Sequence, residues 1–414
     1  MAGHPEKQYD IVIAGGGMIG ASLAVALAPL QLRVAVVEAV ARGETQQPSF
    51  DDRSTALSRS TQRMFEAMRL WDEVIATSTP IRRIHVSDRG RFGFSHIDAA
   101  DQNVDALGYV VINRVLGEVL QSALAGLESV DMLCPVRVVD IEASDNAMTV
   151  RLEHDGGRHQ ELSCELLVAA DGANSSLRPM MGICATKTDY DQHAVVGNLL
   201  PEKPLDNCAY ERFTDQGPLA MLPVADDRAA FVWTVSSSDA ERVLALDDES
   251  FVNELQAVFG YRLGRFSRVG KRAAYPLALS KAMRLTAARS VLVGNSAHGL
   301  HPVAAQGFNL GMRDVAALCD CIADARSTES GEDIGDPDLL QRYAAWRRDD
   351  QGKLVRLTDG IVRLFGSSRP PARIARNIGM LGFDLVPGVR SLFARHMMGL
   401  AGRLPRLSRG VPLR

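Results

Sequence analysis

The apolar pattern at the start of the chain predicts a strand, a helix and a second strand. These elements fall at Tyr9 to Ala14, Ala21 to Leu30 and Arg33 to Val37. No charged residue occurs from Ile11 to Leu32, so a transmembrane helix or a signal peptide is the alternative. The cluster of glycines between residues 15 and 20 argues against both, and we expect a buried strand followed by a buried helix.

Further runs extend this alternation to about residue 172. Asp51 to Ser58 is polar and predicts a loop, after which an amphipathic helix runs through Leu70. A hairpin, a strand, a helix and a meander are predicted at Ile84 to Ser95, Tyr109 to Ile112, Arg114 to Leu127 and Val136 to Cys164. Leu166 to Ala170 has the pattern of a buried strand and ends at Asp171-Gly172. An Asp at the carboxyl end of a central strand faces the crevice where doubly wound sheets bind ligands.

The pattern changes to short strands with turn residues between them from about residue 195 to 275. Strands are predicted at Val195 to Leu200, Ala209 to Phe213, Pro218 to Pro223 and Ala229 to Val235, and a helix at Ser250 to Phe259. They indicate an antiparallel sheet that interrupts the first fold, which resumes at Ser290. The two domains are therefore interleaved in the sequence.

The stretch from Ser290 to Asp314 combines a strand, a loop of small residues and the start of a helix. Asn295 to Gln306 is rich in Gly, Ala, His and Pro, and Phe308 to Ala317 resumes a helical pattern. A helix start behind such a loop presents unpaired N–H groups that suit an anionic or carbonyl-bearing ligand. The alternative is an ordinary connection between a strand and a helix.

Composition narrows the class of protein. A chain of 414 residues with 46% hydrophobic content predicts two to three globular domains, and a net charge of −4 gives no reason to expect a nucleic acid partner. The six cysteines are scattered without a CxxC, which favours reduced thiols in a cytoplasmic protein and leaves a metal site a remote alternative. We expect the acidic connection from Ser327 to Asp338 to be a mobile loop without chemistry.

The first two strands frame a dinucleotide fingerprint. Gly15, Gly17 and Gly20 fit G-x-G-x-x-G, and Glu38 ends the second strand, where a carboxylate accepts hydrogen bonds from a ribose diol. An ADP-containing cofactor is therefore expected. The chain holds one such fingerprint, so a reductant of bound FAD would have no Rossmann domain of its own. Arg53 is a candidate phosphate clamp, with a solvated surface arginine as the alternative.

These motifs together resemble those of the single-component FAD-dependent aromatic hydroxylases, the class of para-hydroxybenzoate hydroxylase. The resemblance rests on the fingerprint with Glu38, on Asp171-Gly172, on Gly294-Asn295 and on His301 to Gly311. Other stretches resemble the ubiquinone-biosynthesis branch of that class: His85 to Gly90, Glu211 to Pro223, Phe259 to Leu279 and GFNLGMRD from Gly307. The resemblance spans nearly the whole chain.

The resemblance implies an α/β fold in which a Rossmann-type FAD-binding domain is interleaved with an antiparallel-sheet substrate domain and followed by a C-terminal helical segment. The FAD-binding domain would take residues 1–80, 111–190 and 281–360. The substrate domain would take a hairpin at 81–110 and a sheet at 191–280, and 361–414 would form a basic tail.

The resemblance also assigns roles to residues. Gly15, Gly17, Gly20 and Glu38 would hold the ADP half of FAD, Arg53 and Arg114 its phosphates or ribityl chain, and Asp171-Gly172 both FAD and NAD(P)H. Pro302, Gly307 and Asn309 would lie beside the isoalloxazine, and Asn295 would bind a ribityl hydroxyl. Two positions depart from the pattern. The wider class has Asp at Asn295, which would weaken FAD binding, and the ubiquinone branch has Gly at Ala305, where a positive φ would strain alanine by about 1 kcal/mol.

The implied reaction is hydroxylation of a polyprenylated phenol by O2 and NAD(P)H through a flavin C4a-hydroperoxide, in ubiquinone biosynthesis. The protein must supply a dry pocket and a group that takes the phenolic proton. His298, His301, Tyr210 and Tyr275 are weak candidates for that group. Leu219, Met221 and Pro223 are expected to line the pocket.

Two alternatives stay open. One is a flavin-dependent halogenase or prenyl reductase on the same fold, although Phe231 to Val235 does not match the W-x-W-x-I-P of halogenases. The other is a non-catalytic flavoprotein scaffold of a quinone-biosynthesis complex.

The last segment, from Ile361 to Arg414, is strongly basic. It holds ten arginines, no lysine and no glutamate, with Asp384 its one acid. Apolar residues alternate with the arginines, which suits a surface lying on anionic lipid. The tail is therefore expected either to contact the membrane peripherally, or to dock on the acidic remainder of the chain or on other quinone-biosynthesis proteins.

Overall fold

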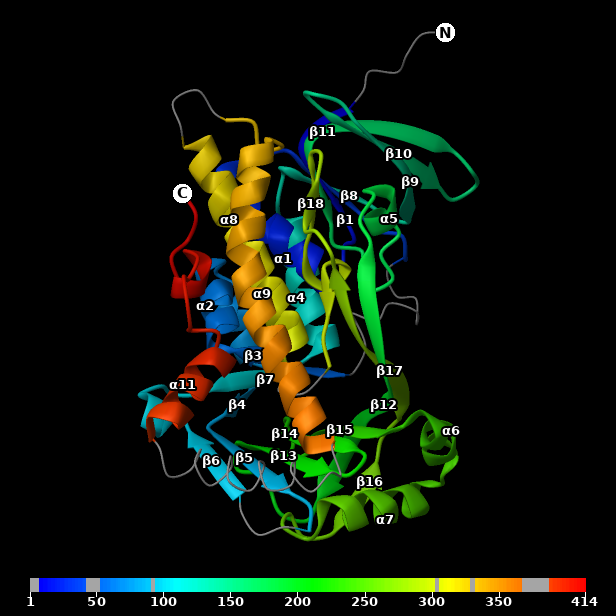
Figure 1. Ribbon diagram of the computed structural model, residues 1–414, viewed down its shortest axis with the longest axis vertical. Coiled ribbons are helices and arrows are strands. Elements are labelled where there is room, and N and C mark those ends of the chain that lie inside the picture. The colour runs from blue at the N-terminus through cyan, green and yellow to red at the C-terminus, as the bar shows by residue number, and fades with distance from the viewer. Residues whose placement is uncertain (1–6, 42–52, 91–93, 302–304, 328–331, 367–386) are drawn as a thin grey trace.

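The computed structural model describes residues 7–41, 53–90, 94–301, 305–327, 332–366 and 387–414. Two large sheets lie in opposite halves of the described structure. The long helices α8 (Gln306–Arg326) and α9 (Pro337–Gly366) run beside them. Figure 1 shows α9 reaching from the upper sheet to the lower one. The mixed α/β fold expected from the sequence is confirmed.

The first sheet has eight strands in the order β18-β19-β11-β1-β2-β8, with β10 and β9 continuing from β11. Five of them pair in parallel: β1 (Lys7–Ala14), β2 (Val34–Val37), β8 (Val130–Leu133), β11 (His159–Ala169) and β19 (Ser290–Leu292). The rest are antiparallel: β9 (Val136–Ala143), β10 (Met148–His154) and β18 (Thr286–Ala287). Parallel strands require crossovers, which helices supply.

Those crossover helices make the core of this half. Helix α1 (Met18–Leu27) packs against α8 and α4 (Asn113–Ala125), and α8 packs against α9. Ile11, Ile13 and Leu23 have no exposed surface. The uncharged stretch near the N-terminus is thus the buried strand and helix that the glycines indicated.

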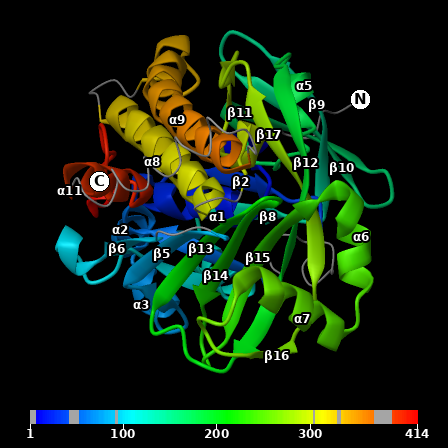
Figure 2. The same ribbon diagram turned by 60° about the horizontal axis from the view of Figure 1, so that its bottom comes forward.

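The second sheet has nine strands in the order β20-β17-β12-β15-β14-β13-β5-β6, with β16 paired to β12. They are β5 (Arg83–Asp88), β6 (Phe94–Asp98), β12 (Ala185–Pro201), β13 (Cys208–Thr214), β14 (Gly217–Pro223), β15 (Ala229–Ser236), β16 (Phe266–Val269), β17 (Ala273–Ala282) and β20 (His298–Gly299). Helices α6 (Ser237–Ala245) and α7 (Asp248–Phe259) lie along its outer side, as Figure 2 shows. The expected antiparallel sheet is confirmed, with β5 and β13 as one parallel pair.

A third, small sheet bridges the two halves. It consists of β3 (Ser54–Ser58), β7 (Gly108–Ile112) and β4 (Thr79–Ile81), beside α2 (Arg59–Ala67) and α3 (Trp71–Ile75). The prediction of a loop up to Ser58 is wrong for residues 54–58, because pairing with β7 makes a strand of a polar segment. Asp51 and Asp52 lie outside the described residues.

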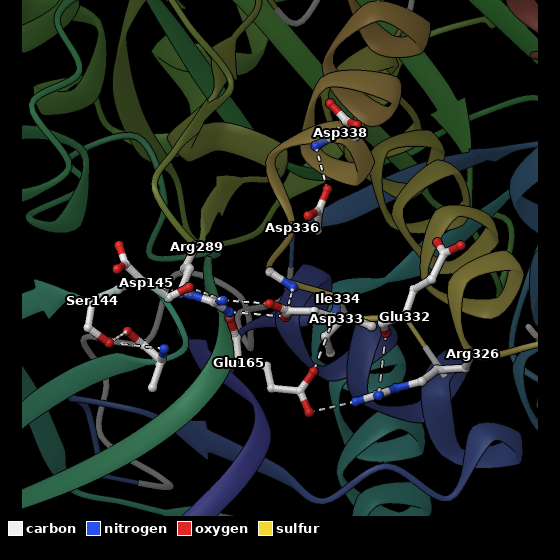
Figure 3. Close-up of polar contacts among 12 residues, drawn as sticks. Ser144, Asp145, Glu165, Arg289, Arg326, Glu332, Asp333, Ile334, Asp336 and Asp338 are labelled. Carbon is white, nitrogen blue, oxygen red and sulfur yellow. Dashed lines mark hydrogen bonds and ion pairs between the residues drawn. The ribbon is translucent and has the colours of Figure 1, made fainter. Parts of the chain in front are cut away.

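The connection between α8 and α9 is anchored where the structure describes it. Arg289 binds both carboxylate oxygens of Asp333 and the carbonyl oxygens of Ser144 and Glu165, as Figure 3 shows. Arg326 pairs with the Glu165 carboxylate at 2.8 Å. These contacts hold Asp333 in place, and the expected mobility of the connection stays a prediction.

The described part of the basic tail packs on its own chain. Ala394 of helix α11 (Pro387–Met397) and Met398, which follows the helix, lie in a small core with Ile97 of β6, and Leu407 and Leu413 join the main core. Arg406 pairs with Asp320 and Asp324. The acidic remainder of the chain is thus the partner of this part of the tail. Over the residues described, no helix is long and apolar enough to cross a bilayer. The short helix α5 (Leu177–Met180) lies between β11 and β12 in the chain.

Candidate functional site

The glycine loop after β1 has the geometry that the fingerprint predicts. Gly15 has φ +106°, and a Cβ on it would lie 2.4 Å from the Ala170 carbonyl oxygen. A Cβ on Gly20 would lie 1.9 Å from the Gly15 carbonyl oxygen. Both positions therefore require glycine. Gly17 is the N-cap of α1 in extended geometry, and no described side chain caps that helix start. Its N–H groups suit a pyrophosphate.

Glu38 lies beside this loop with its carboxylate fixed. Its Oε2 accepts a hydrogen bond from the Gly16 N–H at 2.7 Å, and its Oε1 accepts one from the Val40 N–H at 2.9 Å. A carboxylate held in this way can still accept further hydrogen bonds from a ribose diol, because each oxygen has a second lone pair.

The three segments singled out in the sequence meet around Ile19 and Ala170. Gly15 lies against Ala170, which directly precedes Asp171-Gly172. A Cβ on Gly294 would lie 3.2 Å from the Ile19 side chain, and one on Gly311 would lie 2.7 Å from it. The fingerprint, the end of β11 and the start of α8 therefore form one site.

The start of α8 is open and unusually shaped. Its N-cap, Ala305, has φ 49° and ψ 40°, the left-handed conformation that favours glycine. A Cβ on Gly307 would meet nothing within 4 Å. A flat ligand could therefore lie against the backbone there. Pro302 lies outside the described residues.

Asn309 fixes this helix start to β3 and α2. Its Oδ1 accepts hydrogen bonds from the Ser58 N–H and the Thr61 hydroxyl, both at 2.8 Å. Its Nδ2 donates to the carbonyl oxygens of Ala56 and Ala305, at 2.8 and 2.9 Å. The Asn309 side chain thus positions the loop.

A buried charge network supports the loop from behind. Asp314 Oδ2 accepts hydrogen bonds from the Gly294 N–H at 3.0 Å and binds His298 Nε2 at 2.6 Å, while its Oδ1 binds Arg347 Nε at 2.6 Å. Burial alone would raise the pKa of Asp314, but His298 and Arg347 outweigh it and hold the pKa below its usual range. His298 is held by Asp314, and its role in proton transfer stays a prediction.

Arg53, directly before β3, contacts Tyr275 of β17. The Arg53 guanidinium lies 4.4 Å from the centre of the Tyr275 ring, a cation–π contact. Arg53 is therefore held against Tyr275. Arg114 lies on the first turn of α4 and pairs with Glu118 at 2.9 Å, with half of its side chain exposed. Its predicted phosphate contact stays a prediction.

The remaining predicted residues are placed as follows. Asp171 Oδ2 accepts a hydrogen bond from the Leu177 N–H at 3.1 Å, and Gly172 has φ +84°. Asn295 is exposed beside Gly294. His301 is buried, its ring meets that of Tyr190 edge-on at 5.3 Å, and burial lowers its pKa to about 4. At neutral pH His301 is therefore an uncharged imidazole.

The expected pocket residues on β14 lie on the side of the sheet away from the first domain. Leu219 and Met221 have no exposed surface and belong to the core shared with Phe251 and Leu255 of α7. Pro223 lies on the same side by strand alternation and is also buried. The opposite side carries Ala220 and Leu222, which keep accessible surface. Alternation revealed two faces, but both are apolar, so the sequence could not say which one packs under α7.

The fold and the site define an FAD-dependent monooxygenase: a glycine-rich βαβ unit, an oriented acid after its second strand, and an open helix start facing an antiparallel sheet. The chain belongs to the FAD binding domain family, which it matches over residues 8–358. No cluster of potential metal ligands occurs among the residues described.

Two proteins named as hydroxylases of ubiquinone or its precursors are similar to this chain over nearly its whole length. The chain is 36% identical to the ubiquinone hydroxylase UbiL of Rhodospirillum rubrum, over 100% of this chain and 95% of that protein. It is 30% identical to 3-demethoxyubiquinol 3-hydroxylase of Escherichia coli, over 94% and 98%. Among solved structures, p-nitrophenol 4-monooxygenase PnpA of Pseudomonas putida aligns with a TM-score of 0.78 and 18% identity, covering 96% of this chain and 99% of that one. This last likeness shows the fold alone.

Proposed function

We propose that this protein is an FAD-dependent monooxygenase that hydroxylates the aromatic ring of a polyprenylated phenol in ubiquinone biosynthesis, using NAD(P)H and O2. The proposal rests on the similarity of the chain to two ubiquinone hydroxylases over nearly its whole length. The glycine loop after β1 also has the close backbone packing that the dinucleotide fingerprint requires. Several stretches also resemble the hydroxylases of 2-polyprenyl-6-methoxyphenol, and we propose that compound class as the substrate.

We propose that FAD binds along the converging segments. Gly15, Gly17, Gly20 and Glu38 would hold its ADP half, and the flavin would lie at the start of α8. The second group of contacts comprises Arg53, Arg114, Asp171, Gly172, Asn295, Pro302, Gly307 and Asn309. The fit is supported by the open space at Gly307 and by the fixed Glu38 carboxylate. When bound, FAD accepts a hydride from NAD(P)H and supplies oxygen activated from O2.

The protein's own contribution is orientation and exclusion of water. The dipole of α8 is directed with its positive end at the place proposed for the flavin, where it would stabilise negative charge. The apolar face formed by Ala220 and Leu222 suits a prenylated ring, because such a substrate binds by burying apolar surface.

We also propose peripheral contact with the membrane, because a polyprenylated phenol resides in the bilayer. Support comes from α11, where Leu392 is 59% exposed and Arg395 lies three residues further on, also exposed. An apolar and a basic side chain on one helix face suit an anionic lipid surface. The competing role is docking on other quinone-biosynthesis proteins.

The test of the proposed pathway is mass spectrometry of quinone intermediates in cells that lack this protein. We expect a polyprenylated phenol short of one ring hydroxyl to accumulate, and plasmid-borne protein to remove it. Gly17→Val protein, which should not hold FAD, is the matched control and should not rescue. Rescue by that variant would instead favour a non-catalytic scaffold.

A further inference from the structure

Glu211 lies on the side of β13 that faces the first domain. Its neighbours in the strand point the other way: Tyr210 meets the Phe259 ring of α7 edge-on at 5.8 Å, and Arg212 donates to the Val258 carbonyl oxygen at 3.0 Å. Side chains alternate along a strand, so Glu211 projects away from α7. Ala209, on the same side as Glu211, packs with Val110 of β7.

Glu211 lies in a row of small apolar residues that crosses the sheet. The register pairs Glu211 with Ala220, Ala220 with Val232, and Val232 with Val196. All four keep some accessible surface. The adjacent row on the other face, which includes Met221 and Phe231, is buried under α7. The row therefore forms an apolar wall that carries one carboxyl group.

This wall is connected to the start of α8 by direct contacts. Ala56 of β3 packs with the cluster that contains Ala209 and Leu222, and its carbonyl oxygen accepts the hydrogen bond from Asn309 Nδ2. Helix α9 also packs against β13 and β14, as Figure 1 shows. The face of Glu211 is thus enclosed between the sheet, α9 and the loop proposed for the flavin.

Among the residues described, no charged side chain offsets the effect of burial on Glu211. The residues directly opposite on β5 and β14 are Val86 and Ala220. On α9, Asp359 accepts a hydrogen bond from the Tyr190 hydroxyl at 3.0 Å. Burial alone raises the pKa of Glu211 to about 7. The Glu211 side chain keeps some accessible surface on the face of β13 opposite to α7.

On the basis of the proposed function, we propose that Glu211 is the base that takes the phenolic proton as the ring is hydroxylated. The phenol O–H bond breaks, its proton moves to a Glu211 carboxylate oxygen, and its electron pair flows into the ring. The ring carbon bonds to one oxygen atom of O2 as the O–O bond breaks, and the other oxygen atom leaves as water, with NAD(P)H as the reductant. That carbon then loses its hydrogen as a proton to solvent, and the phenolic oxygen regains a proton from Glu211, which restores both the aromatic ring and the base. A base near neutral pKa matches this task, since the phenol becomes acidic only as the ring reacts.

Glu211→Gln tests the inference, because glutamine keeps the shape and removes the charge. In holoenzyme we expect product formation to fall at least tenfold and to lose the rise with pH near 7 that wild type shows. Bound FAD should be unchanged. Glu241→Gln, at an exposed site on α6, is the matched control and should behave as wild type.

A binding measurement tests the same inference without turnover. A phenol substrate should bind wild-type holoenzyme about ten times more tightly than its methyl ether above pH 7, because only the phenol donates to the Glu211 carboxylate. That preference should shrink below pH 6 and be absent in Glu211→Gln. An unchanged preference and pH profile in the variant would overturn the role of Glu211. Absence of hydroxylated product from wild type, with the preference intact, would overturn the proposed reaction instead.

Discussion

Ala305 carries strain at the point where the cofactor loop enters α8. A φ of 49° brings the alanine Cβ close to its own backbone, at a cost of about 1 kcal/mol. The surrounding contacts must offset that cost, and the Asn309 hydrogen bond to the Ala305 carbonyl oxygen is one of them. A strained backbone conformation at a ligand-binding loop persists only where contacts with neighbouring residues hold it in place.

Ala305→Gly should relieve the strain. We expect the free energy of unfolding to rise by about 0.5 kcal/mol, since part of the relief is lost to the greater freedom of glycine in the unfolded chain. Thermal unfolding of the apo protein measures it. Ala28→Gly, where φ is −50°, is the control and should lose stability. Equal losses in both variants would contradict the left-handed geometry at Ala305.

Glu211 makes stability depend on pH. A folded-state pKa raised to about 7 means that the native protein binds a proton which the unfolded chain releases near pH 4.5, so stability is lost as pH rises towards 7. Glu211→Gln should therefore be more stable than wild type at pH 8, by up to about 3 kcal/mol, and nearly equal at pH 4. Urea unfolding at the two values measures this. A gain that is the same at both would contradict burial as the cause.

Two glycines of the βαβ unit, Gly17 and Gly20, differ in the backbone environment that surrounds them. Gly17 has extended backbone that other residues adopt, whereas a Cβ on Gly20 would collide with the Gly15 carbonyl oxygen. Gly17 should therefore serve the ligand and Gly20 the packing of α1 on β1.

Gly17→Val should fold and lack FAD, because valine blocks the approach of the pyrophosphate. Gly20→Val should unfold at a lower temperature with or without added FAD. Flavin absorbance of the purified proteins, together with their melting curves, separates the two effects. Stoichiometric FAD in Gly17→Val would mean that the βαβ unit does not bind the cofactor.

Elements with a strong local signal were predictable. The β1-α1-β2 unit and strands β13, β14 and β15 follow from apolar periodicity and turn residues. Strand β3 was missed because its partner β7 lies more than fifty residues away. Glu211 was missed because a charged residue in a strand of alternating polarity is usually expected to point to solvent. The packing of α7 on the opposite face of the sheet shows that Glu211 points towards the first domain instead.

Charge is distributed unevenly over the whole molecule, with a tail of ten arginines on an acidic remainder. In its described part, arginines 390 and 406 pair with acids of that remainder, and Leu407 and Leu413 lie in the core. Removing the tail would therefore destabilise the fold, and a truncated chain is a poor test of membrane contact.

Surface substitutions on α11 test that contact without disturbing the core. Intact protein should sediment with anionic liposomes at low salt and less as salt rises. Leu392→Ser with Arg395→Gln should weaken binding about tenfold, whereas Arg228→Gln, on the β14 to β15 turn with its side chain 43% exposed, should not. Equal binding by all three proteins, or binding to neutral liposomes as strong, would leave protein docking as the tail's role.

Hydroxylation of a phenol ring by an oxygen atom from O2 is the central claim, and isotope transfer measures it most directly. Purified yellow holoenzyme would be given a polyprenylated phenol, NAD(P)H and O2 labelled with the heavy oxygen isotope, and the product analysed by mass spectrometry. We predict one labelled hydroxyl on the ring for each NAD(P)H consumed. A colourless protein, or NAD(P)H oxidation that yields hydrogen peroxide and leaves every such phenol unlabelled, would contradict the account.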